Sequence, residues 1–77
     1  MFTNIYAILY QESFYNLKFY VINYKQSNQN NKAANRSLLL KALKNHNAAR
    51  NNLGYSSLSF EEVNNSVFKS VSYFKFK

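Results

Sequence analysis

Seventy-seven residues make one small domain, close to the lower size limit at which a single hydrophobic core stabilises a fold. The chain has no cysteine, so neither disulfides nor thiolate metal sites can supplement that core. Ten Lys and Arg residues against three Glu give a net charge of +7, which favours a polyanionic partner: RNA, DNA or an anionic membrane surface.

The first element is an aromatic segment, residues 1–25, rich in Tyr, Phe, Ile and Val, which suit a pleated, half-buried surface. Over residues 17–25 both alternating faces are largely apolar or aromatic, as in a strand that is covered on both sides. We therefore predict an aromatic β-hairpin with two strands joined through residues 11–16. A helix over residues 2–24 stays open, because two groups of apolar residues also have helical spacing: Phe2, Ile5, Tyr6 and Leu9, then Leu17, Tyr20, Val21 and Tyr24.

Residues 26–36 are polar and of low complexity, which predicts a linker, or an extension that becomes ordered only against a partner. Residues 37–53 are predicted to form a helix, with Ser37 as its N-cap and Gly54 as the left-handed residue after its end. One face of this helix is apolar and includes the single histidine of the chain: Leu39, Ala42, Leu43, His46, Ala49 and Leu53.

A second helix is predicted to begin at Ser59, because Ser59 and Glu62 have the spacing of a capping box. Glu61 and Glu62 then lie at the positive end of the helix dipole, which accounts for two of the three acids. The predicted fold class is α+β, in one small domain: an aromatic N-terminal β-hairpin (1–25), a polar linker or extension (26–36), and a two-helix segment with an aromatic and basic tail (37–77). An all-α fold is the alternative.

The composition argues against an enzyme. The chain has one His, no Cys and no Asp, so no paired carboxylates, metal cluster, nucleophile–base pair or glycine-rich phosphate loop can be assembled. His46 is the single acid–base candidate, and its position on the apolar helix face predicts a packed, structural histidine. We predict no catalytic residue, no metal, no cofactor and no small-molecule substrate.

The strongest functional signal is the basic centre of the chain, where 48 residues between Glu12 and Glu61 include no acid. Five cations of this stretch are predicted to bind RNA phosphates: Lys32, Arg36, Lys41, Lys44 and Arg50. Solvated helices usually interleave Glu with Lys, so cations without acids favour a phosphate-lined partner. Three asparagines are predicted to add polar RNA contacts: Asn45, Asn47 and Asn51. Docking of this kind recognises the phosphate backbone rather than the base sequence.

The aromatic residues are separated from that centre, since all 14 Phe and Tyr residues lie outside residues 25–54. We predict that the aromatic ends form the core and a protein interface with neighbouring subunits: Tyr6, Tyr10, Tyr20, Tyr24 and Phe74. Contact with a membrane surface is a weaker alternative. A membrane span is not expected, because no apolar stretch approaches roughly 20 residues.

The predicted function is that of a non-catalytic subunit of a large ribonucleoprotein, an organellar or divergent ribosome, with rRNA and neighbouring proteins as partners. Asn, Lys, Tyr, Phe and Ile, which have AT-rich codons, make up 38 of 77 residues, and this suits an organelle genome, an AT-rich protist or bacterium, or a phage. The first 17 residues contain no Lys or Arg, which argues against a retained mitochondrial presequence. The predicted location is a mitochondrial or other organellar matrix, for a protein that is organelle-encoded or lacks a retained presequence, with the cytoplasm as the alternative. Two other functions stay open: an accessory subunit of a membrane-associated respiratory complex, and a phage-encoded modulator of a nucleic-acid machine.

Overall fold

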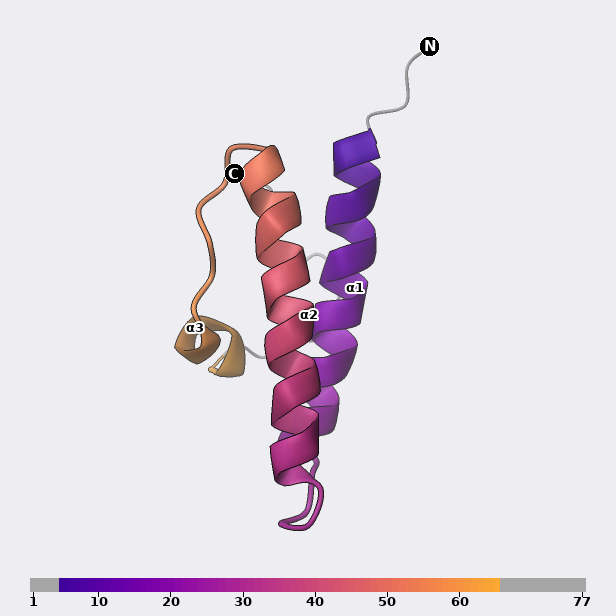
Figure 1. Cartoon of the computed structure of the whole chain (residues 1–77), viewed down its shortest axis with the longest axis vertical. Coiled ribbons are helices and arrows are strands. Elements are labelled where there is room, and N and C mark those ends of the chain that lie inside the picture. The colour runs from indigo at the N-terminus through magenta and orange to yellow at the C-terminus, as the bar shows by residue number, and fades with distance from the viewer. Residues whose placement is uncertain (1–4, 66–77) are drawn as a thin grey trace.

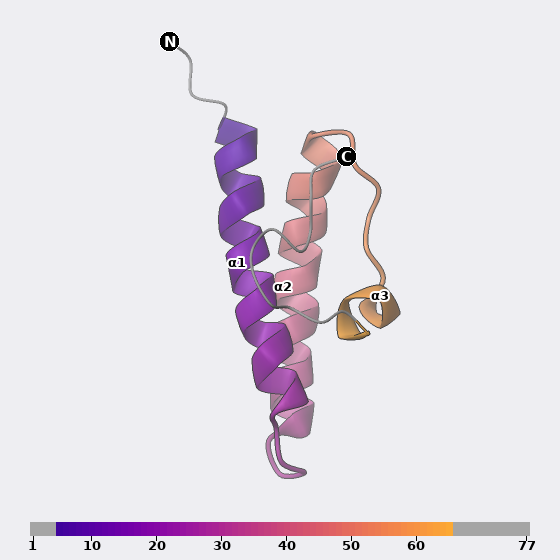
Figure 2. The same ribbon diagram turned by 180° about the vertical axis from the view of Figure 1, so that it is seen from behind.

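The computed structural model describes residues 5–65. Helix α1 (Ile5–Lys25) and helix α2 (Lys32–Asn52) run antiparallel, side by side, and form a long helical hairpin (Figure 1). The short helix α3 (Phe60–Asn64) follows an extended segment and packs beside α2, as the view from behind also shows (Figure 2). The architecture of the described residues is therefore all-α.

The predicted aromatic β-hairpin is wrong, because residues 5–25 form one continuous helix and the described part of the chain contains no strand. The all-α alternative is the correct one. The physical reason is that α1 carries large apolar side chains on two opposite faces. Four side chains at helical spacing are buried on one face, Tyr10, Phe14, Leu17 and Val21, while large apolar side chains also occupy the opposite face. In the sequence, apolar residues on opposite helix faces give the same pattern as a strand that is covered on both sides.

The polar segment between the two long helices is shorter than predicted. Helix α2 begins at Lys32 rather than at Ser37, so only residues 26–31 connect the helices. The Ser27 hydroxyl donates to the Asn23 carbonyl at 2.7 Å and accepts a hydrogen bond from the Asn35 amide. The backbone N–H of Asn31 donates to the side-chain oxygen of Asn28 at 3.1 Å. These local side-chain bonds make the connector an ordered turn.

The apolar face predicted for α2 is confirmed, with Leu39, Ala42, Leu43, His46 and Ala49 buried against its neighbours and Leu53 half-buried. The end of α2 is also as predicted, because Gly54 has a φ of +85°. The Tyr55 N–H donates to the Arg50 carbonyl at 2.9 Å and the Gly54 N–H to the Asn51 carbonyl at 3.0 Å. This pair of bonds is a Schellman motif, which requires a left-handed residue at position 54.

The predicted capping box at α3 is confirmed as well. The Glu62 N–H donates to the Ser59 hydroxyl at 3.1 Å, and the Ser59 N–H donates to the Glu62 carboxylate at 3.0 Å. Val63 of α3 is fully buried and joins the two long helices in one core: Leu17, Val21, Leu39, Ala42, Leu43 and Val63. The predicted tail, residues 73–77, lies outside the described residues.

Candidate nucleic-acid interface

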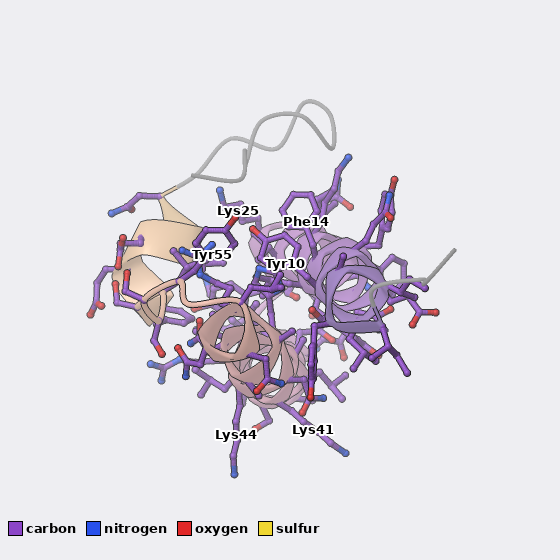
Figure 3. All side chains as sticks on the ribbon, turned by 90° about the horizontal axis from the view of Figure 1, so that it is seen from above. Tyr10, Phe14, Lys25, Lys41, Lys44 and Tyr55 are labelled. Carbon is purple, nitrogen blue, oxygen red and sulfur yellow. The ribbon has the colours of Figure 1, made fainter. Side chains whose placement is uncertain are left out.

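The five cations predicted to bind phosphate lie on two separate surfaces of the hairpin. Lys41 and Lys44 are exposed and project together from the outer side of α2 (Figure 3). Tyr10 and Tyr55 meet on the opposite side of the molecule in the same view. No acid of α2 lies beside the two lysines, because α2 contains none. This surface, which we call the outer face of α2, keeps an uncompensated positive charge.

The other three predicted cations share a strip of α2 that is turned toward α3 and the segment before it. Each lies over an aromatic ring, within the range of about 6 Å from the ring centroid at which cation–π attraction acts. The Lys32 ammonium is 5.3 Å from the Tyr24 ring centroid and the Arg36 guanidinium is 4.9 Å from that of Phe60. Both cations remain exposed. They can therefore stack on their rings and still face a charged partner.

Arg50 is bound more firmly into the fold than the other cations. Its Nε donates to the Ser56 carbonyl at 2.7 Å, its Nη1 donates to the Tyr10 hydroxyl at 3.2 Å, and its guanidinium lies 5.4 Å from the Tyr55 ring centroid. These contacts join α1, α2 and the segment after α2. The structure therefore gives Arg50 a structural role that its charge alone did not indicate.

The three predicted asparagines also have different environments. Asn47 is half-buried and makes two bonds to the backbone of Leu58, accepting from its N–H at 2.8 Å and donating to its carbonyl at 2.9 Å. Asn51 is exposed and accepts a hydrogen bond from the Ser57 hydroxyl at 3.4 Å. Asn45 is exposed on α2, one turn from Lys41. Of the three, Asn45 lies closest in sequence to the exposed lysines, next to Lys44.

A shallow groove of about 220 Å³ runs between α1 and α2 next to Lys41. Its walls carry both polar and apolar side chains: Ser13, Asn16 and Tyr20 of α1 and Leu38, Lys41, Ala42 and Asn45 of α2. Amide groups and one ammonium can donate hydrogen bonds to phosphate and sugar oxygens. The groove therefore extends the polar surface of α2 toward α1.

His46 has the packed position that the sequence predicted, but it also has a hydroxyl neighbour that the sequence did not reveal. The Ser13 oxygen is 2.8 Å from Nδ1 of His46, and the Ser13 hydroxyl proton is donated to the Tyr10 carbonyl at 3.0 Å. Nδ1–H is then the donor to Ser13. Nε2 of His46 has no hydrogen-bond partner among the described residues, where the ring packs against Tyr10 and Phe14.

Geometry and electrostatics make this Ser–His pair structural. Burial, followed by the nearby positive charge of Arg50, lowers the pKa of His46 to about 4, so the ring is a weak base near neutral pH. The serine proton is already committed to the Tyr10 carbonyl. A nucleophile needs a base that can take its proton and a third group that orients the base. Neither is present among residues 5–65, and no group of three or more metal-ligating side chains occurs there.

The residues predicted to form a protein interface are distributed between core and surface. Tyr10 is buried, Tyr20 and Tyr24 are half-buried against the core, and Tyr6 is 50% exposed. Phe74 lies outside the described residues. The prediction missed a row of exposed apolar side chains on α1, which includes Ile8 and Phe19. In the sequence these residues are spaced alternately three and four positions apart, a pattern that indicates a shared face only once α1 is known to be a helix.

Within residues 5–65, neither long helix combines the length and the apolarity that a bilayer crossing requires. The chain matches no family model, no curated protein and no solved structure.

Proposed function

We propose that the protein is a non-catalytic, basic subunit of a large ribonucleoprotein, and that it binds RNA phosphates through the outer face of α2. The observation that carries this proposal is the charge of α2: five cations and no acid over a 21-residue helix. A helix that only faced solvent would lose stability from its own like charges and would gain from interleaved acids. Phosphates of a bound RNA supply the missing negative charge.

Lys41 and Lys44 are the primary phosphate contacts in this proposal, because they are exposed and project away from α1 and α3 (Figure 3). Asn45 lies beside them, at the edge of the groove between the long helices. Lys32 and Arg36 add charge from the neighbouring strip. Lysine neutralises phosphate as a flexible point charge, whereas base reading relies on bidentate arginine contacts. Binding is therefore expected to depend on salt and to be indifferent to RNA sequence.

The test is RNA binding by fluorescence anisotropy between about 50 and 200 mM salt. The variant Lys41→Gln/Lys44→Gln is expected to bind RNA more weakly, with the slope of log affinity against log salt reduced by roughly 1.4 to 1.8, because two counterion-releasing contacts are lost. The matched control is Lys18→Gln/Lys25→Gln, which removes the same charge from α1. Equal losses in both variants, or no RNA binding at low salt, would contradict the assigned surface.

A second experiment addresses the kind of assembly. A ribonucleoprotein subunit, such as a component of an organellar or divergent ribosome, sediments with RNA in native extracts and is released by ribonuclease. A subunit of a membrane-associated complex stays with detergent-solubilised particles after the same treatment. The second outcome would contradict the proposed assembly and favour a protein–protein accessory role.

A further inference from the structure

One face of α1 carries a mainly apolar stripe along nearly the whole helix, interrupted by Glu12, which also lines a shallow groove beside α2. Its members follow the alternating three- and four-residue spacing of a coiled-coil seam, and we call them the outer stripe of α1: Ile5, Ile8, Glu12, Tyr15, Phe19 and Ile22. Ile5 is 61% exposed and Phe19 is 59% exposed in the single chain, whereas Ile22 at the C-terminal end of the stripe is half-buried. The stripe lies opposite the buried side chains Phe14 and Val21.

We propose that the outer stripe of α1 is the interface of an antiparallel homodimer, in which α1 of a second copy packs along it. At a rise of 1.5 Å per residue the stripe is about 25 Å long, and a helix face about 10 Å wide makes it a patch of roughly 250 Å². Its coiled-coil spacing suits a second helix as the partner. A second copy offers a patch of the same length and the same spacing.

The position of Glu12, the only acid in α1, selects the antiparallel arrangement. In a parallel, in-register pair the seam would place Glu12 against Glu12 of the other copy, two like charges removed from water. In an antiparallel pair centred between residues 13 and 14, Glu12 faces Tyr15 and lies one turn from Lys18 of the other copy. The carboxylate then meets a hydroxyl donor and an ammonium group.

In the same register, each remaining member of the stripe faces an apolar side chain of the other copy. Ile5 faces Ile22 of the other copy, and Ile8 faces Phe19. Six layers form with no mismatched position, which is the complementarity that a seam of this length requires. A parallel pair would match the apolar layers equally well, so the carboxylate at position 12 decides between the two directions.

The net charge of +7 per chain does not prevent this pairing. Because α2 packs on the face of α1 opposite the stripe, the dimer has the helix order α2, α1, α1, α2, with the basic helices outermost. The two α2 helices are then about 25–30 Å apart, at three interhelical spacings of about 8–10 Å. That separation exceeds the screening length of about 8 Å at physiological ionic strength. The outer faces of α2 also remain free for the proposed RNA contact.

Sedimentation equilibrium of the full chain at micromolar concentrations and physiological salt tests the dimer. The expected mass is twice the 9.1 kDa of the chain. Phe19→Glu places an unpaired carboxylate in the seam and is expected to raise the dimer dissociation constant about a hundredfold or more. The matched control is Leu40→Glu on α2, since Leu40 is also exposed (41%) but lies outside the stripe. Circular dichroism establishes that both variants keep their helices.

A monomeric wild-type chain would overturn the proposal, and so would a dimer that Phe19→Glu leaves intact. A monomer that binds anionic phospholipid vesicles through Phe19 would replace the second copy by a membrane surface. RNA binding by Lys41 and Lys44 is unaffected by any of these outcomes, so failure of the dimer is distinguishable from failure of the proposed function.

Single-cysteine variants test the direction of packing, because the natural chain has no cysteine. In the antiparallel register Ile8 of one copy lies against Phe19 of the other. A mixture of Ile8→Cys and Phe19→Cys chains is therefore expected to form a disulfide-linked heterodimer on mild oxidation, whereas neither variant alone links efficiently. Efficient linking of each variant with itself would indicate parallel packing and would overturn the proposed arrangement.

Discussion

At the scale of single residues, the energetics of His46 are set by its burial. The side chain is 1% exposed, its Nδ1 is bonded to Ser13, and its neighbours are mainly apolar. A charged imidazolium at this place would lose hydration and would also lie near the Arg50 guanidinium, so both effects lower the pKa of His46 in the folded state. The neutral ring is therefore part of the folded structure.

This lowered pKa predicts an acid-dependent loss of stability. The unfolded chain takes up a proton at its ordinary pKa of 6.5, whereas the folded chain takes it up only near pH 4. The free energy of unfolding is thus highest above pH 6.5 and is expected to fall as the pH drops toward 4, with a limiting slope of about 1.4 kcal/mol per pH unit. Urea denaturation at a series of pH values measures this change in the free energy of unfolding.

His46→Leu is the control for that measurement, because it removes the only histidine of the chain. Its free energy of unfolding is expected to be flat between about pH 6.5 and 4.5. The capping bonds with Ser59 lower the pKa of Glu62, so the stability that they confer is present above the ordinary pKa of a glutamate and is lost as the pH falls below it, at the acid end of this window and beyond. An equal slope in the wild type and in His46→Leu would show that another group is responsible.

At the scale of elements, the sequence predicts those features that depend on neighbours along the chain. The capping box of Ser59, the left-handed Gly54 and the buried face around Leu39 each follow from a local pattern, and all three are present. The sequence did not decide whether α1 is a helix or a strand, because a helix with two apolar faces and a strand covered on both sides have the same composition. The outer stripe of α1 was missed for the same reason.

Within the candidate site, charge and spacing identified the cations but not their surroundings. The helical period places Lys41 and Lys44 together, and the structure agrees. Arg50 and Asn47 are held by Ser56 and Leu58 of the segment after α2, and the path of that segment is set by tertiary packing. No local pattern indicates such contacts, so the sequence could not separate structural from exposed polar residues.

The end of α2 gives a prediction at the same scale. A Cβ added at Gly54 meets no atom within 4 Å, so the cost of Gly54→Ala comes from the backbone alone. The positive φ that the Schellman motif requires costs an alanine about 1–2 kcal/mol. We expect Gly54→Ala to lower the free energy of unfolding by that amount and Gly54→Asn to lower it less, because asparagine tolerates this conformation better. Equal stability of Gly54→Ala and the wild type in thermal unfolding would contradict the role assigned to this turn.

At the scale of the whole molecule, two surfaces with different chemistry lie on different sides of one helical hairpin. The outer face of α2 is basic, and the outer stripe of α1 is apolar. The core between them is small, since nine apolar side chains are buried within residues 5–65. Large apolar residues kept on the surface of α1 are not available to that core. The limited set of apolar side chains is therefore divided between the core, which stabilises the fold, and the exposed surface of α1.

The run Leu38, Leu39 and Leu40 tests how much of the stability rests on that core. Leu39 is fully buried, whereas Leu38 and Leu40 are 45% and 41% exposed. Leu39→Ala is expected to lower the free energy of unfolding by about 2–5 kcal/mol, a large part of the roughly 4–12 kcal/mol typical for a chain of this length. Leu40→Ala, one position away, is expected to change it by about 0.5 kcal/mol or less.

Urea titrations followed by circular dichroism, at one fixed protein concentration, measure both variants, since self-association would add to the apparent stability. The same substitution at adjacent positions of one helix alters helix propensity equally, so the difference between the two variants reports packing alone. Equal losses would mean that α2 does not pack on α1 through Leu39. A large loss confined to Leu39→Ala would establish that the buried face of α2 stabilises the hairpin, and that the exposed Leu40 contributes little to the fold.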